Sequence, residues 1–228
     1  GTPLRDAELV VETPELWRVE VNGQRVDFAR APRWRDDLNI RRAPVGRWLR
    51  EGKNTIVLRG RPFDVRREID RVLLLGSFAC APAAQGFTLA PARPLRLGPW
   101  RAQGLPFYDG EVAYRFALPR GAGHGVLELG TADWAGALII VEQGGRRVAQ
   151  LHEAPFVVPL DAADGREVVW RVVGLPKNLF GPWHYPHKDP KWAGPGMWRS
   201  AEIPTAPQPG KNYDLLDLGL FAPPRWRQ

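Results

Sequence analysis

One aromatic stretch near the C-terminal end of the chain holds the residues best suited to chemistry. This stretch, residues 177–211, is long, rich in Pro and Gly, and crowded with rings. Sugar rings present a face of C–H groups that stacks on Trp or Tyr, and their hydroxyls pair with carboxylate or imidazole groups. The candidates for carbohydrate contact are Trp183, His184, Tyr185, His187, Asp189, Trp192 and Trp198, with Lys191 as a further polar partner. An alternative stays open, because aromatic side chains also fill the interface between a loop and a neighbouring domain.

The spacing His184-x-x-His187-x-Asp189 places three potential metal ligands close together in this stretch. A structural zinc site needs a fixed tetrahedral ligand set, and no Cys or further His lies at a compatible spacing. We expect the two imidazoles to act as hydrogen-bonding groups, with no metal site and no cofactor. Structural calcium stays open, because calcium is often bound by backbone carbonyls, which leave no pattern in a sequence.

Paired carboxylates that could hydrolyse a glycosidic bond are the next candidates. That reaction needs two carboxyl groups about 5 Å or about 6.5–9.5 Å apart across the bond. The close pairs in the sequence are Asp36 with Asp37, Glu68 with Asp70, and Asp109 with Glu111. Each pair falls in a turn or at the rim of a strand, where solvated acids are common. Adjacent residues of a strand also point to opposite faces, which disfavours the first pair.

The candidate nucleophiles lack the neighbours that would activate them. Ser77 and Ser200 are the only serines, and neither lies in a nucleophile-elbow motif. Cys80, the only cysteine, has no nearby His to lower its pKa, and a single cysteine excludes an intrachain disulfide. The chain has no Gly-rich loop of the kind that binds phosphates. We therefore expect no catalytic activity in this chain alone.

A second group of aromatic and polar residues precedes a predicted strand at residues 112–118. It consists of Trp100, Gln103, Phe107, Tyr108 and Asp109. A Gly-x-Pro-Phe-Tyr segment more often fixes the path of the chain into a sheet than binds a ligand. For this group we favour core packing.

Alternation of apolar and polar residues dominates the rest of the chain and predicts antiparallel strands. The clearest strand-like runs are residues 8–12, 16–21, 54–59, 112–118, 126–129, 137–142 and 167–173. Asn22-Gly23 is a two-residue hairpin signal, because both positions must tolerate positive φ. No stretch with helical periodicity exceeds about two turns, so helices should be few and short. The sequence therefore predicts an all-β fold built from antiparallel sandwiches.

Three landmarks recur in the same order, which indicates two tandem copies of one unit. The pairs are Asn22–Val26 with Gly144–Val148, Leu58–Pro62 with Val173–Pro176, and Ile69–Ala79 with Asn212–Ala222. We predict two β-sandwich (jelly-roll) units, residues 1–83 and residues 84–228. A duplicated β unit is more often a binding or scaffolding module than a catalytic centre.

The two predicted copies differ in two places. The second has an additional strand pair before residues 126–129, whereas the first lacks these opening strands, which would expose sheet edges. We expect the chain to be the C-terminal part of a longer protein, unless residues 1–14 close the first unit in another way. The interval from Gly174 to Gly219 is also much longer than that from Gly60 to Gly76. This insertion is the aromatic stretch, and its rings argue against disorder.

Composition adds few constraints. The formal charge is +7, which would suit a polyanion, but the Arg residues are spread singly along the predicted strands. Scattered basic residues support a nucleic-acid partner weakly, and we do not expect one unless they converge on one face. No apolar stretch approaches the length of a membrane span, so we expect no membrane partner.

Several segments resemble the sugar-binding β-sandwich domains of family 2-type glycoside hydrolases. Residues 17–23, which end in Val21-Asn22-Gly23, match the hairpin of those domains, and residues 47–56 match their next strand entry. Residues 97–108 and 177–184 resemble C-terminal modules of bacterial glycosidases related to α-L-rhamnosidases. The resemblance implies a galactose-binding-like jelly roll, an upstream catalytic domain in a parent chain, and a secreted or periplasmic bacterial location. One departure is Trp183, which stands where similar modules often have the first of two His residues.

The resemblance favours a noncatalytic module that binds or positions an oligo- or polysaccharide for a glycoside hydrolase. Two other interpretations stay open. The chain could be a purely structural domain that buttresses a catalytic domain, or a C-terminal fragment of the glycosidase that contributes one loop to its active site.

Overall fold

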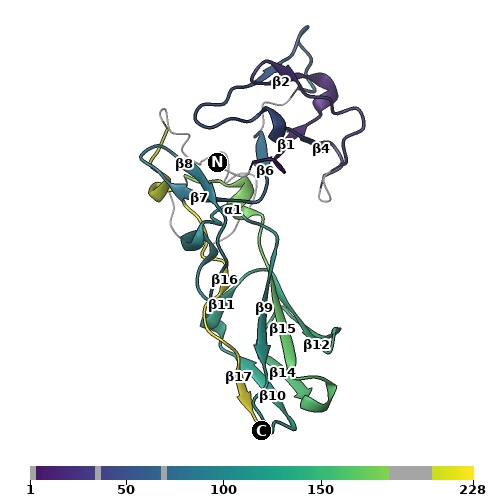
Figure 1. Ribbon diagram of the computed structural model, residues 1–228, viewed down its shortest axis with the longest axis vertical. Helices are drawn as coiled ribbons and strands as arrows, with labels where there is room; N and C mark the ends of the chain where they lie inside the picture. The colour runs from purple at the N-terminus through teal and green to yellow at the C-terminus, as the bar shows by residue number, and fades with distance from the viewer. Residues whose placement is uncertain (1–3, 34–36, 68–70, 185–206) are drawn as a thin grey trace. The chain divides into compact units, whose positions relative to one another are not determined.

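The computed structural model of the chain describes residues 4–33, 37–67, 71–184 and 207–228 (Figure 1). Antiparallel strands dominate these residues, and none of their helices is longer than four residues. The predicted all-β sandwich fold is confirmed. The chain forms two compact units, which we call unit 1 (residues 1–79 and 89–92) and unit 2 (residues 80–88 and 93–228). Within the described residues, no helix has the length and apolar character needed to cross a bilayer.

Unit 1 consists of two three-stranded antiparallel sheets. The order in one sheet is β4 (Ile40–Pro44), β1 (Glu8–Glu12) and β6 (Leu73–Leu75). The order in the other is β3 (Gln24–Arg25), β2 (Arg18–Val21) and β5 (Ile56–Arg59). Two short 3-10 helices, η1 (Pro14–Leu16) and η2 (Gly46–Trp48), lie in the connections. Leu9 and Val11 of β1 pack with Val19 and Val21 of β2 in the core, as alternation of side chains predicts.

Two-residue turns close a hairpin in each unit. Asn22 and Gly23 join β2 to β3, with φ angles of 50° and 81°. Gly144 and Gly145 join two strands of unit 2, with φ angles of 57° and 75°. Positive φ at both positions is the type I′ geometry that the right-handed twist of a hairpin requires. The Asn22-Gly23 turn is therefore confirmed, whereas the duplication of the two units remains a prediction.

The chain passes between the units through β7 (Phe78–Pro82) and β8 (Phe87–Pro91), which pair as a two-stranded sheet. The predicted boundary between residues 83 and 84 lies in the turn that joins these strands. In unit 1, β1 is the middle strand of its sheet, so the first described strand has neighbours on both edges.

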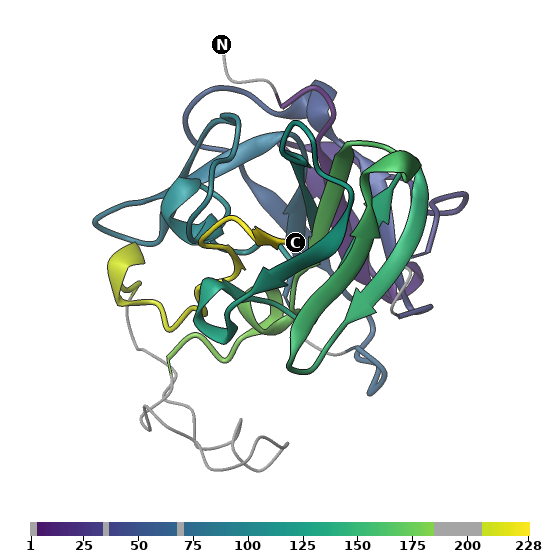
Figure 2. The same cartoon turned by 90° about the horizontal axis from the view of Figure 1, so that it is seen from below.

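Unit 2 is the larger sandwich. One sheet has the order β13 (Arg146–Leu151), β12 (Leu138–Gln143), β15 (Glu167–Val173) and β9 (Glu111–Ala117). The other has the order β14 (Phe156–Asp161), β10 (His124–Leu129) and β17 (Arg225–Arg227). A short pair, β11 (Trp134–Ala135) with β16 (Gly219–Leu220), lies beside them. Figure 2 shows the green strands of the four-stranded sheet side by side.

The helical segments of unit 2 are all short and lie in the connections. They are η3 (Trp100–Gln103), η4 (Thr131–Asp133), η5 (Ala162–Asp164), α1 (Lys177–Phe180) and η6 (Gly210–Asn212). The core lies between the sheets and includes the fully buried side chains of Ile139, Val141 and Trp170. These residues alternate with outward-facing ones along β12 and β15, so the period-two pattern read from the sequence corresponds to the inner face of the sheet.

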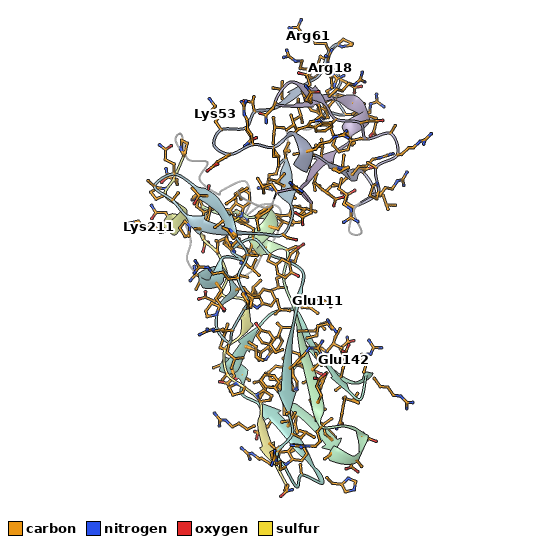
Figure 3. All side chains as sticks on the ribbon, viewed as in Figure 1. Arg18, Lys53, Arg61, Glu111, Glu142 and Lys211 are labelled. Atoms are coloured by element: carbon orange, nitrogen blue, oxygen red, sulfur yellow. The ribbon has the colours of Figure 1, made fainter. Side chains whose placement is uncertain are left out.

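The outer face of the four-stranded sheet carries a small charge network (Figure 3). Arg171 of β15 pairs with Glu111 of β9 and with Glu142 of β12, both at 3.2 Å. These neighbours and their hydrogen bonds raise the pKa of the guanidinium, with the Glu142 bond as the largest cause. Such cross-strand pairs help to fix the register of the sheet.

Candidate functional site

Five rings from separate parts of unit 2 gather into one cluster, which we call the ring cluster: Phe87, Phe107, Trp183, His184 and Tyr213. Tyr213 lies at the centre, with ring centroids 4.7 Å from His184, 5.1 Å from Phe87 and 6.0 Å from Trp183. Phe107 contacts Phe87 at 4.7 Å and Trp183 at 5.9 Å. Most of these contacts are edge-to-face, the arrangement that the ring quadrupole favours.

The ring cluster forms because two chain segments are tied together by their backbones. The N–H of Asp214 donates to the carbonyl of Trp183 at 2.7 Å, which places Trp183 and Tyr213 next to each other. Leu179 and Phe180 of α1 donate to Pro176, so α1 turns the chain back from β15 toward this contact. Gly181 follows α1 with φ at 79°, a conformation that suits Gly at a helix end.

Asn178 of α1 fixes the second segment. Its side-chain amide is 2 % exposed, donates to the carbonyl of Leu216 at 3.0 Å and accepts from the N–H of Leu216 at 2.8 Å. The carbonyl of Asn178 accepts a hydrogen bond from the indole Nε1 of Trp183 at 2.8 Å. One buried residue therefore orients both the segment that carries Tyr213 and the indole of Trp183.

Lys177 of α1 also joins the two segments that carry the rings. Its Nζ donates to the carbonyl of Pro182 at 2.9 Å and to the carbonyl of Asp214. Partial burial lowers the pKa of this ammonium, and the Asp214 carboxylate opposes the effect. Lys177 thus acts as a backbone clamp, with its donors directed at carbonyl oxygens.

All five rings of the ring cluster are partly exposed, so they combine mutual packing with a surface open to solvent. A partly exposed aromatic surface can stack against the C–H face of a sugar. The His184 imidazole supplies a polar edge beside the rings, and it can donate or accept a hydrogen bond. The arrangement therefore combines apolar ring surface with one polar edge, which is suited to binding.

Of the seven residues predicted for carbohydrate contact, the structure brings Trp183 and His184 together in the ring cluster. The remaining five, Tyr185, His187, Asp189, Trp192 and Trp198, lie outside the described residues.

Phe87 and Tyr213 belong to the cluster but were not predicted from the sequence. Tyr213 lies two residues beyond the end of the aromatic stretch. Since the two ends of an inserted loop must meet, a ring at this position could have been predicted to contact the start of the loop.

The members of the second predicted group have three different roles. Trp100 is 1 % exposed and donates from Nε1 to the Tyr114 hydroxyl at 2.7 Å, so it belongs to the core. The Gln103 amide bonds to the backbone of Arg96 in both directions, at 2.7 and 3.0 Å, and fixes the path of the chain there. Phe107 instead lies in the ring cluster. Core packing describes Trp100, while Phe107 is part of the candidate site.

The candidate catalytic residues that the structure describes take part in ion pairs and backbone hydrogen bonds or are partly buried. Glu111 pairs with Arg171, and the Asp37 carboxylate accepts from the backbone N–H of Asn39 at 2.8 Å. Burial raises the pKa of the Cys80 thiol to about 11, which disfavours the nucleophilic thiolate. Asp36, Glu68, Asp70 and Ser200 lie outside the described residues. Among the residues that the structure describes, no group of three or more His, Cys, Asp or Glu side chains could hold a metal ion.

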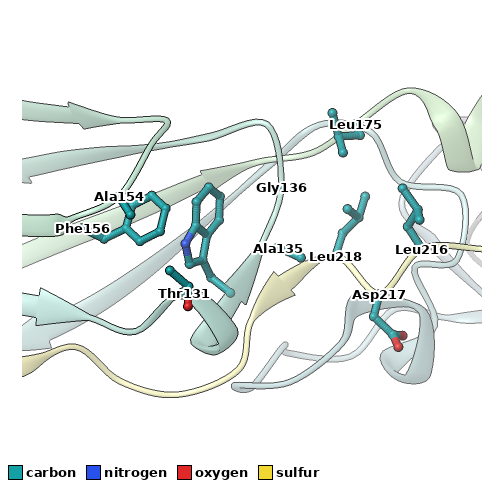
Figure 4. Close-up of a pocket in the computed structure, with 10 residues that line it drawn as sticks. Thr131, Ala135, Gly136, Ala154, Phe156, Leu175, Leu216, Asp217 and Leu218 are labelled. Atoms are coloured by element: carbon teal, nitrogen blue, oxygen red, sulfur yellow. The ribbon is translucent and has the colours of Figure 1, made fainter. Parts of the chain in front are cut away.

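An apolar pocket of about 490 Å³ opens in unit 2 near the segment that follows Tyr213 (Figure 4). Its lining residues are Thr131, Trp134, Ala135, Gly136, Ala154, Phe156, Leu175, Leu216, Asp217 and Leu218. The Trp134 and Phe156 rings meet edge to face at 5.1 Å. Asn178 links this pocket to the ring cluster, because it bonds to the backbone of Leu216 and accepts from the indole of Trp183.

Comparison with known proteins gives no relative for this chain, since no family model, curated protein or solved structure matches it.

Proposed function

We propose that the chain is a noncatalytic carbohydrate-binding module, and that the ring cluster of unit 2 is its contact surface for an oligo- or polysaccharide. The observation that carries the proposal is that five partly exposed rings, drawn from four separate chain segments, share one site. A sugar ring needs an aromatic face and nearby polar groups, and Tyr213 with His184 offers both. In keeping with the sequence resemblance, the module would bind or position a carbohydrate for an upstream catalytic domain of a secreted or periplasmic glycoside hydrolase.

The way in which the site is built supports preorganised binding. Asn178 and Lys177 hold the backbones on either side of the rings through hydrogen bonds to Leu216, Pro182 and Asp214. A ligand that meets a fixed surface does not have to order it, which improves affinity. Sugar hydroxyls lose bound water when the sugar binds, which weakens binding. A surface that is already ordered avoids a further entropy cost.

A structural role is the second candidate, and one observation favours it. Trp183 directs its indole N–H to the carbonyl of Asn178, and its ring meets Phe107 edge to face. A ring whose donor is satisfied internally can serve as a plug that joins α1 to the rest of unit 2. On this view the domain buttresses a neighbouring catalytic domain and contacts no sugar.

Retention on immobilised polysaccharides, measured by affinity electrophoresis and followed by a glycan array, separates the two functions. If the ring cluster binds sugar, Tyr213→Leu should abolish retention, because it removes the central ring. Tyr213→Phe is the matched control, since it keeps the ring and should retain most of the binding.

The same variants also report on stability. Under the structural role, every glycan fails with the unmodified protein, and Tyr213→Leu does no more than lower the thermal midpoint. If the unmodified protein is retained and Tyr213→Leu is retained equally strongly, carbohydrate binds elsewhere on the chain and the ring cluster is not the site.

A further inference from the structure

The apolar pocket of unit 2 differs in chemistry from the ring cluster. Leu175, Leu216 and Leu218 form one end and Phe156 with Ala154 the other (Figure 4). Its volume of about 490 Å³ falls in the range of small-molecule sites, roughly 300–1,000 Å³. The leucine, alanine and phenylalanine walls offer no partner to the several hydroxyls of a sugar ring, and burying unpaired hydroxyls is unfavourable. The pocket therefore suits an apolar group better than a saccharide.

The charged residue in the lining is already neutralised. Both oxygens of the Asp217 carboxylate accept hydrogen bonds from the Arg101 guanidinium, and Figure 4 shows the carboxylate directed away from the leucine side chains. A charged ligand would gain little from this bidentate pair. The occupant that fits is uncharged.

The aromatic side chains of the lining favour a particular kind of apolar group. Trp134 lines the pocket next to Phe156, and its indole N–H has no hydrogen-bond acceptor among the described residues. Thr131 adds a hydroxyl to the lining. A planar ring that carries an oxygen atom can pack against the Trp134–Phe156 pair and pair with one of these donors.

The pocket also lies close to the ring cluster along the chain. Tyr213 and Leu216 are three residues apart, so their Cα atoms are separated by at most about 11 Å. Asn178 bonds both to Leu216, which lines the pocket, and to the indole of Trp183, which belongs to the ring cluster. Tyr213 of the ring cluster and Leu216 of the pocket are therefore near neighbours in space.

We propose that the pocket is a subsite for an uncharged aryl group linked through oxygen to the saccharide that the ring cluster binds. This inference rests on the proposed function, and it names the ligand class as aryl glycosides or sugars bearing a phenolic substituent. The sugar would stack on the rings around Tyr213, and the aryl group would enter between Phe156 and Leu216.

The test compares three probes on the full chain: phenol alone, and phenyl and methyl glycosides of the same sugars. The readouts are the affinity by calorimetry and the indole N–H resonance of Trp134, assigned with Trp134→Phe. Phenol should shift that resonance, and each phenyl glycoside that binds should bind about tenfold more tightly than its methyl partner, a typical gain for burying one ring.

Leu216→Trp provides the pocket variant, because this side chain is 41 % exposed and its backbone bonds to Asn178 survive the change. A bulky ring at this position should close the pocket and remove both the phenol response and the phenyl preference. Leu97→Trp is the matched control: Leu97 is 40 % exposed and does not line the pocket, so it should leave both unchanged.

The outcomes distinguish this inference from the function on which it rests. If phenol leaves Trp134 unperturbed and phenyl and methyl glycosides bind equally, the aryl subsite is wrong while carbohydrate binding stands. If phenol binds in the pocket but no glycoside binds at all, the proposed function is wrong, and the aryl group cannot be assigned to a saccharide. A phenyl preference that persists in Leu216→Trp would also overturn the subsite.

Discussion

The side chain of Asn178 forms a two-way hydrogen-bonded pair with the backbone of Leu216, accepting from its N–H at 2.8 Å and donating to its carbonyl at 3.0 Å. A side-chain amide can imitate a neighbouring strand in this way, because it offers one donor and one acceptor with the spacing of a peptide group. Leu216 belongs to no strand, so the bonds from Asn178 take the place of the backbone hydrogen bonds that a neighbouring strand would provide. It holds the segment between Tyr213 and Leu218 against α1 without regular secondary structure.

Asn178→Ala should destabilise unit 2 by about 1–3 kcal/mol, because removing the buried amide leaves the N–H and the carbonyl of Leu216 without their partners. Urea unfolding followed by tryptophan fluorescence measures the loss. Asn212→Ala is the control, because Asn212 is exposed and should change stability by less than about 0.5 kcal/mol. Equal effects of the two substitutions would show that the Asn178 pair contributes nothing specific.

Tyr114→Phe should be one of the more damaging conservative changes in unit 2. The Tyr114 hydroxyl accepts from the Trp100 indole at 2.7 Å and from the backbone N–H of Leu220 at 3.3 Å, and both donors are buried. Removing one oxygen leaves two donors unpaired, so we expect a loss of about 2–4 kcal/mol in the free energy of unfolding. Tyr108→Phe is the comparison, since the Tyr108 ring is 37 % exposed and water can replace its hydrogen bond.

The strands could be predicted from the sequence because their inner faces repeat every two residues. The predicted run at residues 8–12 coincides with β1, and the run at residues 167–173 coincides with β15. The predicted run at residues 16–21 is wrong at its start, because Leu16 ends the 3-10 helix η1 and the strand begins at Arg18. Pro14 at the first position of η1 favours a helical turn that alternation alone does not reveal.

The candidate site was harder to predict because its residues meet only through tertiary contacts. Trp183 and His184 were recognisable as rings in an unusual stretch, whereas Phe87 lies in a strand nearly a hundred residues earlier. Nothing in the local pattern around Phe87 separates it from an ordinary strand residue. The bond between Asp214 and Trp183 that assembles the cluster joins two backbones, and backbone partners across a long loop carry no signature in residue type.

Asn22→Gly tests how much of the first hairpin depends on a side chain. Glycine accepts the φ of 50°, so the turn geometry is retained. The substitution removes hydrogen bonds from Nδ2 to the Trp48 carbonyl and to the Asn54 amide, both at 2.8 Å, and the bond from the Thr55 N–H at 2.9 Å. We expect a loss of about 1–3 kcal/mol, seen as faster hydrogen exchange in β2 and β5.

Gly145→Asn is the matched control for that substitution. It places the same residue type at a turn position with φ at 75° and with no atom near the added Cβ. Asn adopts this conformation more readily than most residues, so the change should cost less than Asn22→Gly. If Asn22→Gly costs no more than Gly145→Asn, the side-chain network of Asn22 does not stabilise unit 1.

Cys80 provides a pH-dependent prediction, because burial raises the pKa of its thiol to about 11 from 9.0. At pH 8 the native protein should react with iodoacetamide about 100-fold more slowly than the urea-unfolded chain, since the thiolate is the reacting form. The native rate should rise with pH up to about 11.

Because the folded pKa is the higher one, the stabilising contribution of the neutral thiol is present below pH 9 and is lost as the pH rises through about 11. Cys80→Ala should remove this part of the pH dependence. The chain has no other cysteine, so labelling reports on this thiol alone, and equal rates for native and unfolded protein at pH 8 would contradict its burial.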